Sequence, residues 1–155
     1  MPYLIDGHNL IPKLGLRLDS LDDEAELIIR LQEFCRLRRS LLEVYFDGAP
    51  PGQARTRKAG VVNVHFIPQG SSADAAIENR LTRLGKSARN WTVVSSDGRV
   101  QRAARAVHAG VLSSEEFSRE MSRVKEMGTN TLKDEATLAP DQVEEWLDLF
   151  KKKRD

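Results

Sequence analysis

The feature that most constrains the fold is an alternation between short apolar segments and helix-forming segments. Strands are predicted at 3–5, 41–46, 61–67, 91–94 and 111–112, where apolar and β-branched residues gather. Helices are predicted at 22–40, 71–84, 99–108, 113–127 and 141–151, from apolar spacing and capping residues. Strands that alternate with helices form a parallel sheet with right-handed crossovers. The sequence therefore predicts an α/β fold with a single doubly wound parallel sheet flanked by helices.

The length of 155 residues suits one domain with one core. We place this domain at residues 1–127. Residues 128–155 are expected to form a C-terminal helical extension, with a linker-like stretch to residue 139, then a helix, then the basic tail Lys151–Arg154. The polar and basic residues 53–60 are expected to form a mobile loop.

The composition is typical of a globular protein. Hydrophobic residues make up 40% and charged residues 30% of the chain. No apolar run approaches the roughly 20 residues of a membrane helix, and the N-terminus lacks the pattern of a secretory signal. We therefore expect a cytoplasmic location and no membrane partner. The single cysteine, Cys35, cannot form an internal disulfide, and no structural zinc site is expected.

Acidic residues stand where predicted strands end. Three strands are followed by an Asp-Gly pair: Asp6-Gly7, Asp47-Gly48 and, after two serines, Asp97-Gly98. Glycine at these positions lets the chain turn sharply and lets a ligand approach the backbone. Asp74 falls in the first turn of the helix after the third strand, and Glu78 lies one turn further on the same face. Ligands of open parallel sheets bind at the carboxyl ends of the strands, so we expect these carboxylates to converge there.

Several carboxylates in one cleft raise each other's pKa unless a cation neutralises them. Mg²⁺ and Mn²⁺ prefer oxygen ligands, and one or two such ions can polarise a phosphoryl oxygen and activate water. The residues therefore suit phosphodiester hydrolysis, and the chain has no Walker, GxGxxG or GxSxG motif. The residues alone leave a second interpretation open, in which each Asp-Gly pair is only a turn.

Four motifs carry a resemblance to a known family. They are YLIDGHNLI at Tyr3–Ile11, VYFDG at Val44–Gly48, QGSSADAAIE at Gln69–Glu78 and VVSSDG at Val93–Gly98. In order and spacing they resemble the NYN domain, and more closely its YacP-like branch within the PIN-like nuclease superfamily. The resemblance spans about residues 1–127. It implies a doubly wound α/β fold and a Mg²⁺- or Mn²⁺-dependent endoribonuclease.

The resemblance also implies roles for individual residues. The core acidic ligands and catalytic residues are Asp6, Asp74 and Asp97, Asn9 is a further catalytic residue, and Asp47 and Glu78 are additional ligands or water-orienting groups. A simpler interpretation of Asn9 is that its side chain caps a turn. His8 is a candidate general base, although a metal-activated water does not need one and a loop residue is the simpler interpretation.

Basic residues are distributed near the predicted acidic edge. The net charge of +1, from 24 basic and 23 acidic residues, does not by itself indicate nucleic-acid binding. The residues expected to contact RNA phosphates are Arg99, Arg102, Arg80, Arg83, Arg55, Arg57 and Lys58. An aromatic content of 6% argues against an extended base-stacking platform and against strong sequence readout. A ribosome or another ribonucleoprotein is a candidate for presenting the RNA.

Three other functions stay open at this point. A non-catalytic RNA-binding module needs the basic residues but not the acids. Another metal-dependent phosphoesterase or a DNA nuclease can use the same acidic edge. A toxin-like PIN nuclease is the third alternative.

Overall fold

The core of the computed structural model, which describes the backbone of residues 2–16, 21–49 and 56–136, is a six-stranded sheet. Its strands are β1 (Tyr3–Asp6), β2 (Leu42–Ala49), β3 (Thr56–Ala59), β4 (Val62–Pro68), β5 (Thr92–Val94) and β6 (Gly110–Leu112). Their spatial order is β3-β4-β2-β1-β5-β6. All neighbouring pairs are parallel except β3 and β4. The predicted α/β fold is confirmed, with one antiparallel strand at the edge.

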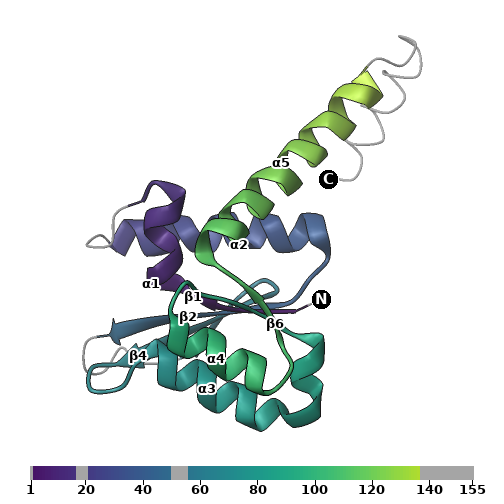
Figure 1. The fold of residues 1–155 in the computed structure, drawn as a ribbon. Coiled ribbons are helices and arrows are strands. Elements are labelled where there is room, and N and C mark those ends of the chain that lie inside the picture. The colour runs from purple at the N-terminus through teal and green to yellow at the C-terminus, as the bar shows by residue number, and fades with distance from the viewer. Residues whose placement is uncertain (1, 17–20, 50–55, 137–155) are drawn as a thin grey trace.

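Helices cover both faces of this sheet (Figure 1). They are α1 (Gly7–Leu10), η1 (Ile11–Leu14), α2 (Leu21–Arg38), α3 (Ala73–Leu84), η2 (Gly85–Asn90), α4 (Gly98–Ala106) and α5 (Ser114–Ala136). The α1, α2 and α5 helices lie on one face, and α3 and α4 lie on the other. In the described ranges, no helix has the length and apolar character that crossing a membrane requires.

Each face of the sheet has its own hydrophobic core. Tyr3 and Ile5 of β1 belong to the core under α2 and α5, whereas Leu4 between them belongs to the core under α3 and α4. All four β1 residues are buried, as expected for a central parallel strand covered on both faces. In the first core the rings of Phe34 and Phe117 meet edge to face at 5.0 Å, a favourable aromatic geometry.

The prediction of a mobile loop at 53–60 is wrong for residues 56–59, which form β3. Residues Thr56–Ala59 pair antiparallel with β4 through a tight hairpin, in which Gly60 has a φ of +63°. The strand is polar and exposed, which suits a sheet edge because charged side chains there discourage pairing with other chains. Such a strand lacks the apolar alternation by which strands are predicted. Residues 53–55 lie outside the described residues.

The predicted linker from residue 128 is also wrong in its first part, because α5 continues to Ala136. Gly128 lies where α5 crosses α2: a Cβ atom there would come within 3.3 Å of Leu37 Cδ2. The glycine therefore permits close helix packing instead of ending the helix. The predicted helix at 141–151 and the basic tail lie outside the described residues.

The loop predicted after β1 is a helical turn, α1, followed by η1. Gly7 begins α1 in an ordinary helical conformation, and the ring of Phe46 occupies the space that a Cβ atom would need. Close packing, not a sharp turn, explains this glycine. Gly48 has a φ of +74° and fits the turn interpretation.

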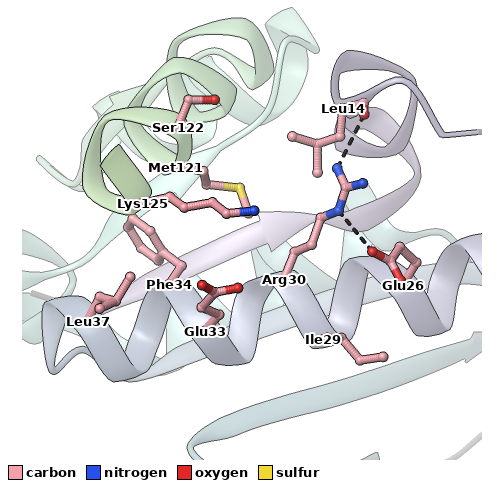
Figure 2. A pocket seen from close by; sticks show the side chains of 10 residues that line it. All are labelled: Leu14, Glu26, Ile29, Arg30, Glu33, Phe34, Leu37, Met121, Ser122 and Lys125. Carbon is pink, nitrogen blue, oxygen red and sulfur yellow. Dashed lines mark hydrogen bonds and ion pairs between the residues drawn. The ribbon is translucent and has the colours of Figure 1, made fainter. Parts of the chain in front are cut away.

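A pocket of about 320 Å³ lies between α2 and α5 (Figure 2). Arg30 spans it, donating from Nε to Glu26 at 3.1 Å and from Nη1 to the Leu14 carbonyl at 3.3 Å. None of the five carboxylates predicted at the strand ends lines this pocket.

Candidate active site

Four elements bring acidic side chains to the carboxyl edge of the sheet. Asp6 is the last residue of β1, and Asp97 is the N-cap of α4 just after β5. Asp74 lies in the first turn of α3. Asp47 lies in β2 directly after Phe46, where the register between β2 and β4 shifts. Because β1 pairs with both β2 and β5, acids that are far apart in the sequence meet at neighbouring strand ends.

Asp74 is the electrostatic centre of this group. Burial raises the pKa of its carboxyl group, and the negative charges of Asp97, Asp47 and Glu78 raise it further. The charge of Asp74 also contributes to the raised pKa of Asp6. The carboxylate on α3 is therefore close enough to interact with acids from β1, β2 and the β5–α4 turn.

Asp6 is the most buried of the five acids, with 8% of its surface exposed. Burial, together with the charge of Asp74, raises its pKa to about 6. A hydrogen bond from the backbone N–H of Asn9 acts in the opposite direction. A carboxyl group with this pKa is ionised at neutral pH only at a cost in free energy, which a nearby cation would remove.

Two of the five acids have a cationic partner. The Nδ1 atom of His8 donates to Asp47 at 2.8 Å. Arg99 donates two hydrogen bonds to the carboxylate of Glu78, from Nε at 2.6 Å and from Nη2 at 3.2 Å. The other three acids, Asp6, Asp74 and Asp97, form no ion pair with any residue that the structure describes.

His8 bridges two carboxylates, since its Nε2 atom lies 3.3 Å from Glu24 Oε1. The hydrogen bond to Glu24 and the bond to Asp47 outweigh burial and raise the pKa of His8 to about 9. The imidazole is therefore protonated at neutral pH, so it cannot accept a proton as a general base. It acts as a positive charge that holds Asp47 beside α2.

The turn that carries Asp97 is fixed by side-chain hydrogen bonds. Asp97 Oδ1 accepts from the backbone N–H of Arg99 at 2.8 Å, which caps α4. The Asp97 N–H donates to Ser95 Oγ at 3.1 Å, and Gln101 Nε2 donates to the Ser95 carbonyl at 2.8 Å. Ser95 is completely buried, so this turn is tied directly to the core.

Asn9 connects three elements. Its Oδ1 atom accepts from the Ser96 N–H at 2.8 Å and from Ser114 Oγ at 2.5 Å. Ser96 Oγ in turn donates to Glu115 at 2.9 Å, and Lys13 lies 2.9 Å from the same carboxylate. In this structure Asn9 therefore positions the β5–α4 turn and the start of α5. The sequence does not predict the roles of Ser114, Glu115 and Glu24 in the site, because each of them binds a residue that lies far away along the chain.

The donors suit a divalent cation. Carboxylate oxygens are the ligands that Mg²⁺ and Mn²⁺ prefer. Burial and neighbouring carboxylates raise the pKa of Asp6 and of Asp74, although the charge of Arg99 lowers that of Asp74, and a bound cation would favour the ionised forms. Across 2–16, 21–49 and 56–136, however, no three acidic, histidine or cysteine side chains form a complete metal cluster as they stand. The donor chemistry fits, but the coordination is not preformed.

The predicted phosphate-binding residues do not form one track. Arg99 lies at the acidic edge in its pair with Glu78, and Arg102 follows on the exposed side of α4. Arg80 instead binds the buried Glu43, and Arg83 lies in the same pocket on the other flank of α3. Arg57 and Lys58 are exposed on β3. Arg55 is outside the described residues.

A model of the YacP-like NYN domain family matches residues 3–153. The chain belongs to this family. The match continues past residue 127, so it includes most of the C-terminal extension. The family is part of the PIN-like nuclease superfamily, and membership suggests nuclease activity.

Solved structures of the YacP family agree with this assignment. The crystal structure of Rae1 (YacP) from Bacillus subtilis is 25% identical, with a TM-score of 0.71, and the alignment covers 99% of this chain and 94% of that chain. A crystal structure of a Rae1 mutant gives the same identity and TM-score over 90% of this chain and 86% of that chain. No curated protein matched this chain.

Proposed function

We propose that this protein is a metal-dependent endoribonuclease that hydrolyses RNA phosphodiester bonds at the acidic edge of the sheet. The observation that carries the proposal is the interaction of Asp74 with acids from three other elements. Repulsive clustering of this kind destabilises a fold unless a ligand relieves it, and it is typical of functional sites. Membership of a nuclease-related family supports hydrolysis, whereas RNA as substrate and the cation are our proposal.

Asp6, Asp74 and Asp97 would hold one or two Mg²⁺ or Mn²⁺ ions. A bound ion supplies polarisation of the phosphoryl oxygen and a water of lowered pKa. Asp6 gives the site a rigid, buried oxygen donor, and Asp97 is oriented by its bonds to Arg99 and Ser95. Asn9 and His8 act as positioning residues, because both hold neighbouring groups of the site in place.

Arg99 is the residue best placed to bind a substrate phosphate. It belongs to the first turn of α4, where the helix dipole also favours an anion. In this role Glu78 is the counter-ion of Arg99 in the free protein, and a substrate phosphate displaces it. Glu78 as a further metal ligand is the alternative role, and the two roles predict different kinetics.

The test is cleavage of a total RNA pool with Mn²⁺ by the wild type and by the Asp97→Asn variant. Asparagine caps helices as well as aspartate does, so this change removes the charge and keeps the cap. We expect the wild type to cut and Asp97→Asn to lose at least about 100-fold in rate. A Glu126→Gln variant, at an exposed acid on α5, is the matched control and should cut like the wild type.

Equal cutting by the wild type and Asp97→Asn would reject Asp97 as a ligand. RNA binding without cleavage would favour the non-catalytic binding module. Preferential cleavage of single-stranded DNA or of a small phosphoester would favour the other metal-dependent phosphoesterases.

A further inference from the structure

A second polar pocket, of about 380 Å³, lies on the flank of α3 that faces β4. The side chains that line it come from β2, β4 and α3, and they include Glu43, Tyr45, Asn63, His65, Asn79 and Arg83. The acidic edge described above uses the opposite flank of α3, where Glu78 meets Arg99 of α4. The pocket is therefore distinct from the proposed metal site.

Strand alternation explains why polar groups meet in this pocket. Val62 and Val64 of β4 are buried in the core under α2, so Asn63 and His65 point to the other face of the sheet. The α3 helix packs over β1 and β2 and leaves this part of β4 partly uncovered. A sheet face next to a helix is usually apolar, which makes these polar residues notable.

On the floor of the pocket the carboxylate of Glu43 is hydrogen-bonded internally, whereas the buried Nε2 atom of His65, 3.4 Å from Glu43 Oε1, forms no hydrogen bond with the residues that the structure describes. The buried Glu43 accepts from the Tyr45 hydroxyl at 2.8 Å and from Arg80 Nη2 at 2.9 Å. Burial alone would raise the pKa of Glu43, but the imidazole of His65 and the bonds from Arg80 and Tyr45 lower it to about 2. Glu43 therefore stays ionised and neutralises Arg80, so the floor offers no free positive charge to a phosphate.

The wall and the rim of the pocket carry groups with unused hydrogen-bonding capacity. The side-chain amides of Asn63 and Asn79 make no hydrogen bond, and Arg83 makes no ion pair, to any residue within the described ranges. Lys58 of β3 stands directly opposite Asn63 in the hairpin register, on the same face of the sheet. Two neutral amides are thus flanked by two exposed cations.

This arrangement suits an unpaired nucleobase with its phosphates. A base is planar and neutral, and amides can donate to it and accept from it, as in recognition of single-stranded RNA. The adjoining phosphates would meet Lys58 and Arg83 at the rim. The volume lies at the lower end of small-ligand sites, about 300–1,000 Å³, so it accommodates a single nucleoside better than a helix or a peptide.

Two residues that line the pocket lie close in sequence to the edge of the sheet where the acids lie. Ile67, near the end of β4, and Ala76, two residues after Asp74, both line it. Asn79 is five residues beyond Asp74, or about 8 Å along the helix axis. A single strand that leaves the acidic edge across the N-terminus of α3 therefore reaches the pocket within a short distance.

We propose that this pocket binds one unpaired base of the RNA strand whose backbone occupies the acidic edge. The inference rests on the proposed function and adds to it a source of base preference at one position of the substrate. It requires no stacking platform, so it agrees with the low aromatic content of the chain.

The test is equilibrium binding of labelled single-stranded octaribonucleotides of A, C, G or U, measured in EDTA so that no cleavage is needed. We expect the wild type to bind the four with different affinities. Asn79→Ala should lower the affinity for the preferred oligonucleotide by roughly 3- to 10-fold, which is the range of one neutral hydrogen bond. It should also reduce the differences in affinity among the four oligonucleotides. Asn63→Ala should act in the same direction.

Two control variants make the result interpretable. Asn79 is exposed, so its replacement should leave the thermal unfolding curve unchanged, and Asn79→Gln should restore part of the preference by keeping the amide. Asn90→Ala, at an exposed asparagine of η2, should bind like the wild type. Equal affinities for the four oligonucleotides in the wild type, or an unchanged preference in Asn79→Ala, would overturn the inference. Failure of the proposed function would show itself separately, as absence of Mn²⁺-dependent cleavage.

Discussion

Asp6 shows at the residue scale how burial and a neighbouring carboxylate raise the pKa of an acid in the proposed metal site. Its folded pKa of about 6 lies above the value of about 3.9 expected in an unfolded chain. Between these values the folded state holds a proton that the unfolded state has released. The stabilisation from this proton is present at low pH and is lost as the pH rises through 6 in the absence of a metal ion.

The Asp6→Asn variant tests this linkage. In EDTA at pH 7.5 we expect it to be more stable than the wild type, by up to about 3 kcal/mol, because asparagine needs no charge in the buried position. At pH 4 the two proteins should have nearly equal free energies of unfolding. Urea denaturation at both pH values measures the difference, and a wild type that is the more stable protein at pH 7.5 would contradict the account.

A substitution at Glu78 shows whether this residue is the counter-ion of Arg99 or a metal ligand. Glu78→Gln removes the charge that competes for Arg99, so we expect KM for RNA to fall by roughly 2- to 5-fold while kcat stays within about threefold. The unfolding free energy should change by less than about 1 kcal/mol, since Arg99 is exposed and Glu78 is partly exposed. Steady-state kinetics with Mn²⁺ decide the point: a drop in kcat of tenfold or more would make Glu78 a ligand.

At the scale of elements, the contact between α3 and β2 shows what sequence patterns miss. Arg80 resembles an RNA-binding residue in the sequence, but it neutralises Glu43 and lies 5.3 Å from the ring centre of Trp91. Neither partner lies near Arg80 in the sequence. Its role depends on which flank of α3 faces which strand, and that is settled only by three-dimensional packing.

The Arg80→Ala variant should therefore be a stability variant. Removing the guanidinium leaves the buried carboxylate of Glu43 without the three hydrogen bonds that Arg80 donates, and we expect the unfolding free energy to fall by about 2–3 kcal/mol. Arg89→Ala, at an exposed arginine of η2, should change it by less than about 0.5 kcal/mol. Thermal and urea unfolding provide the comparison, and equal stability of the two variants would refute this role for Arg80.

The elements also show which parts of the fold the sequence predicts. The strands β1, β2, β4, β5 and β6 and the start of α3 near residues 71–72 follow from apolar runs and capping chemistry, and the structure confirms them. Of the two serines there, Ser72 is the one that caps α3. The β3 strand escapes prediction because Thr56–Ala59 has no apolar side to mark it. The last turns of α5 escape because glycine and threonine at 128–131 have low helix propensity, yet the helix continues, and Gly128 lies against Leu37 of α2.

At the scale of the whole molecule, the site results from topology. The sheet order places β1 between β2 and β5, so that Asp6, Asp47 and Asp97 lie at or just beyond the carboxyl ends of neighbouring strands, and α3 adds Asp74. The sequence predicts that these acids share one edge. It does not predict that His8 binds Asp47 and that Arg99 binds Glu78. Among the described residues this leaves Asp6, Asp74 and Asp97 without an ion pair, and these are the three acids that we propose as metal ligands.

The most direct measurement is a crystal structure of the protein soaked in Mn²⁺, with the metal located by its anomalous scattering. We expect at least one Mn²⁺ ion bound by oxygens of Asp6, Asp74 and Asp97, and no such ion in crystals of Asp97→Asn. A wild-type map in which these three carboxylates point apart with no metal peak between them would contradict this expectation.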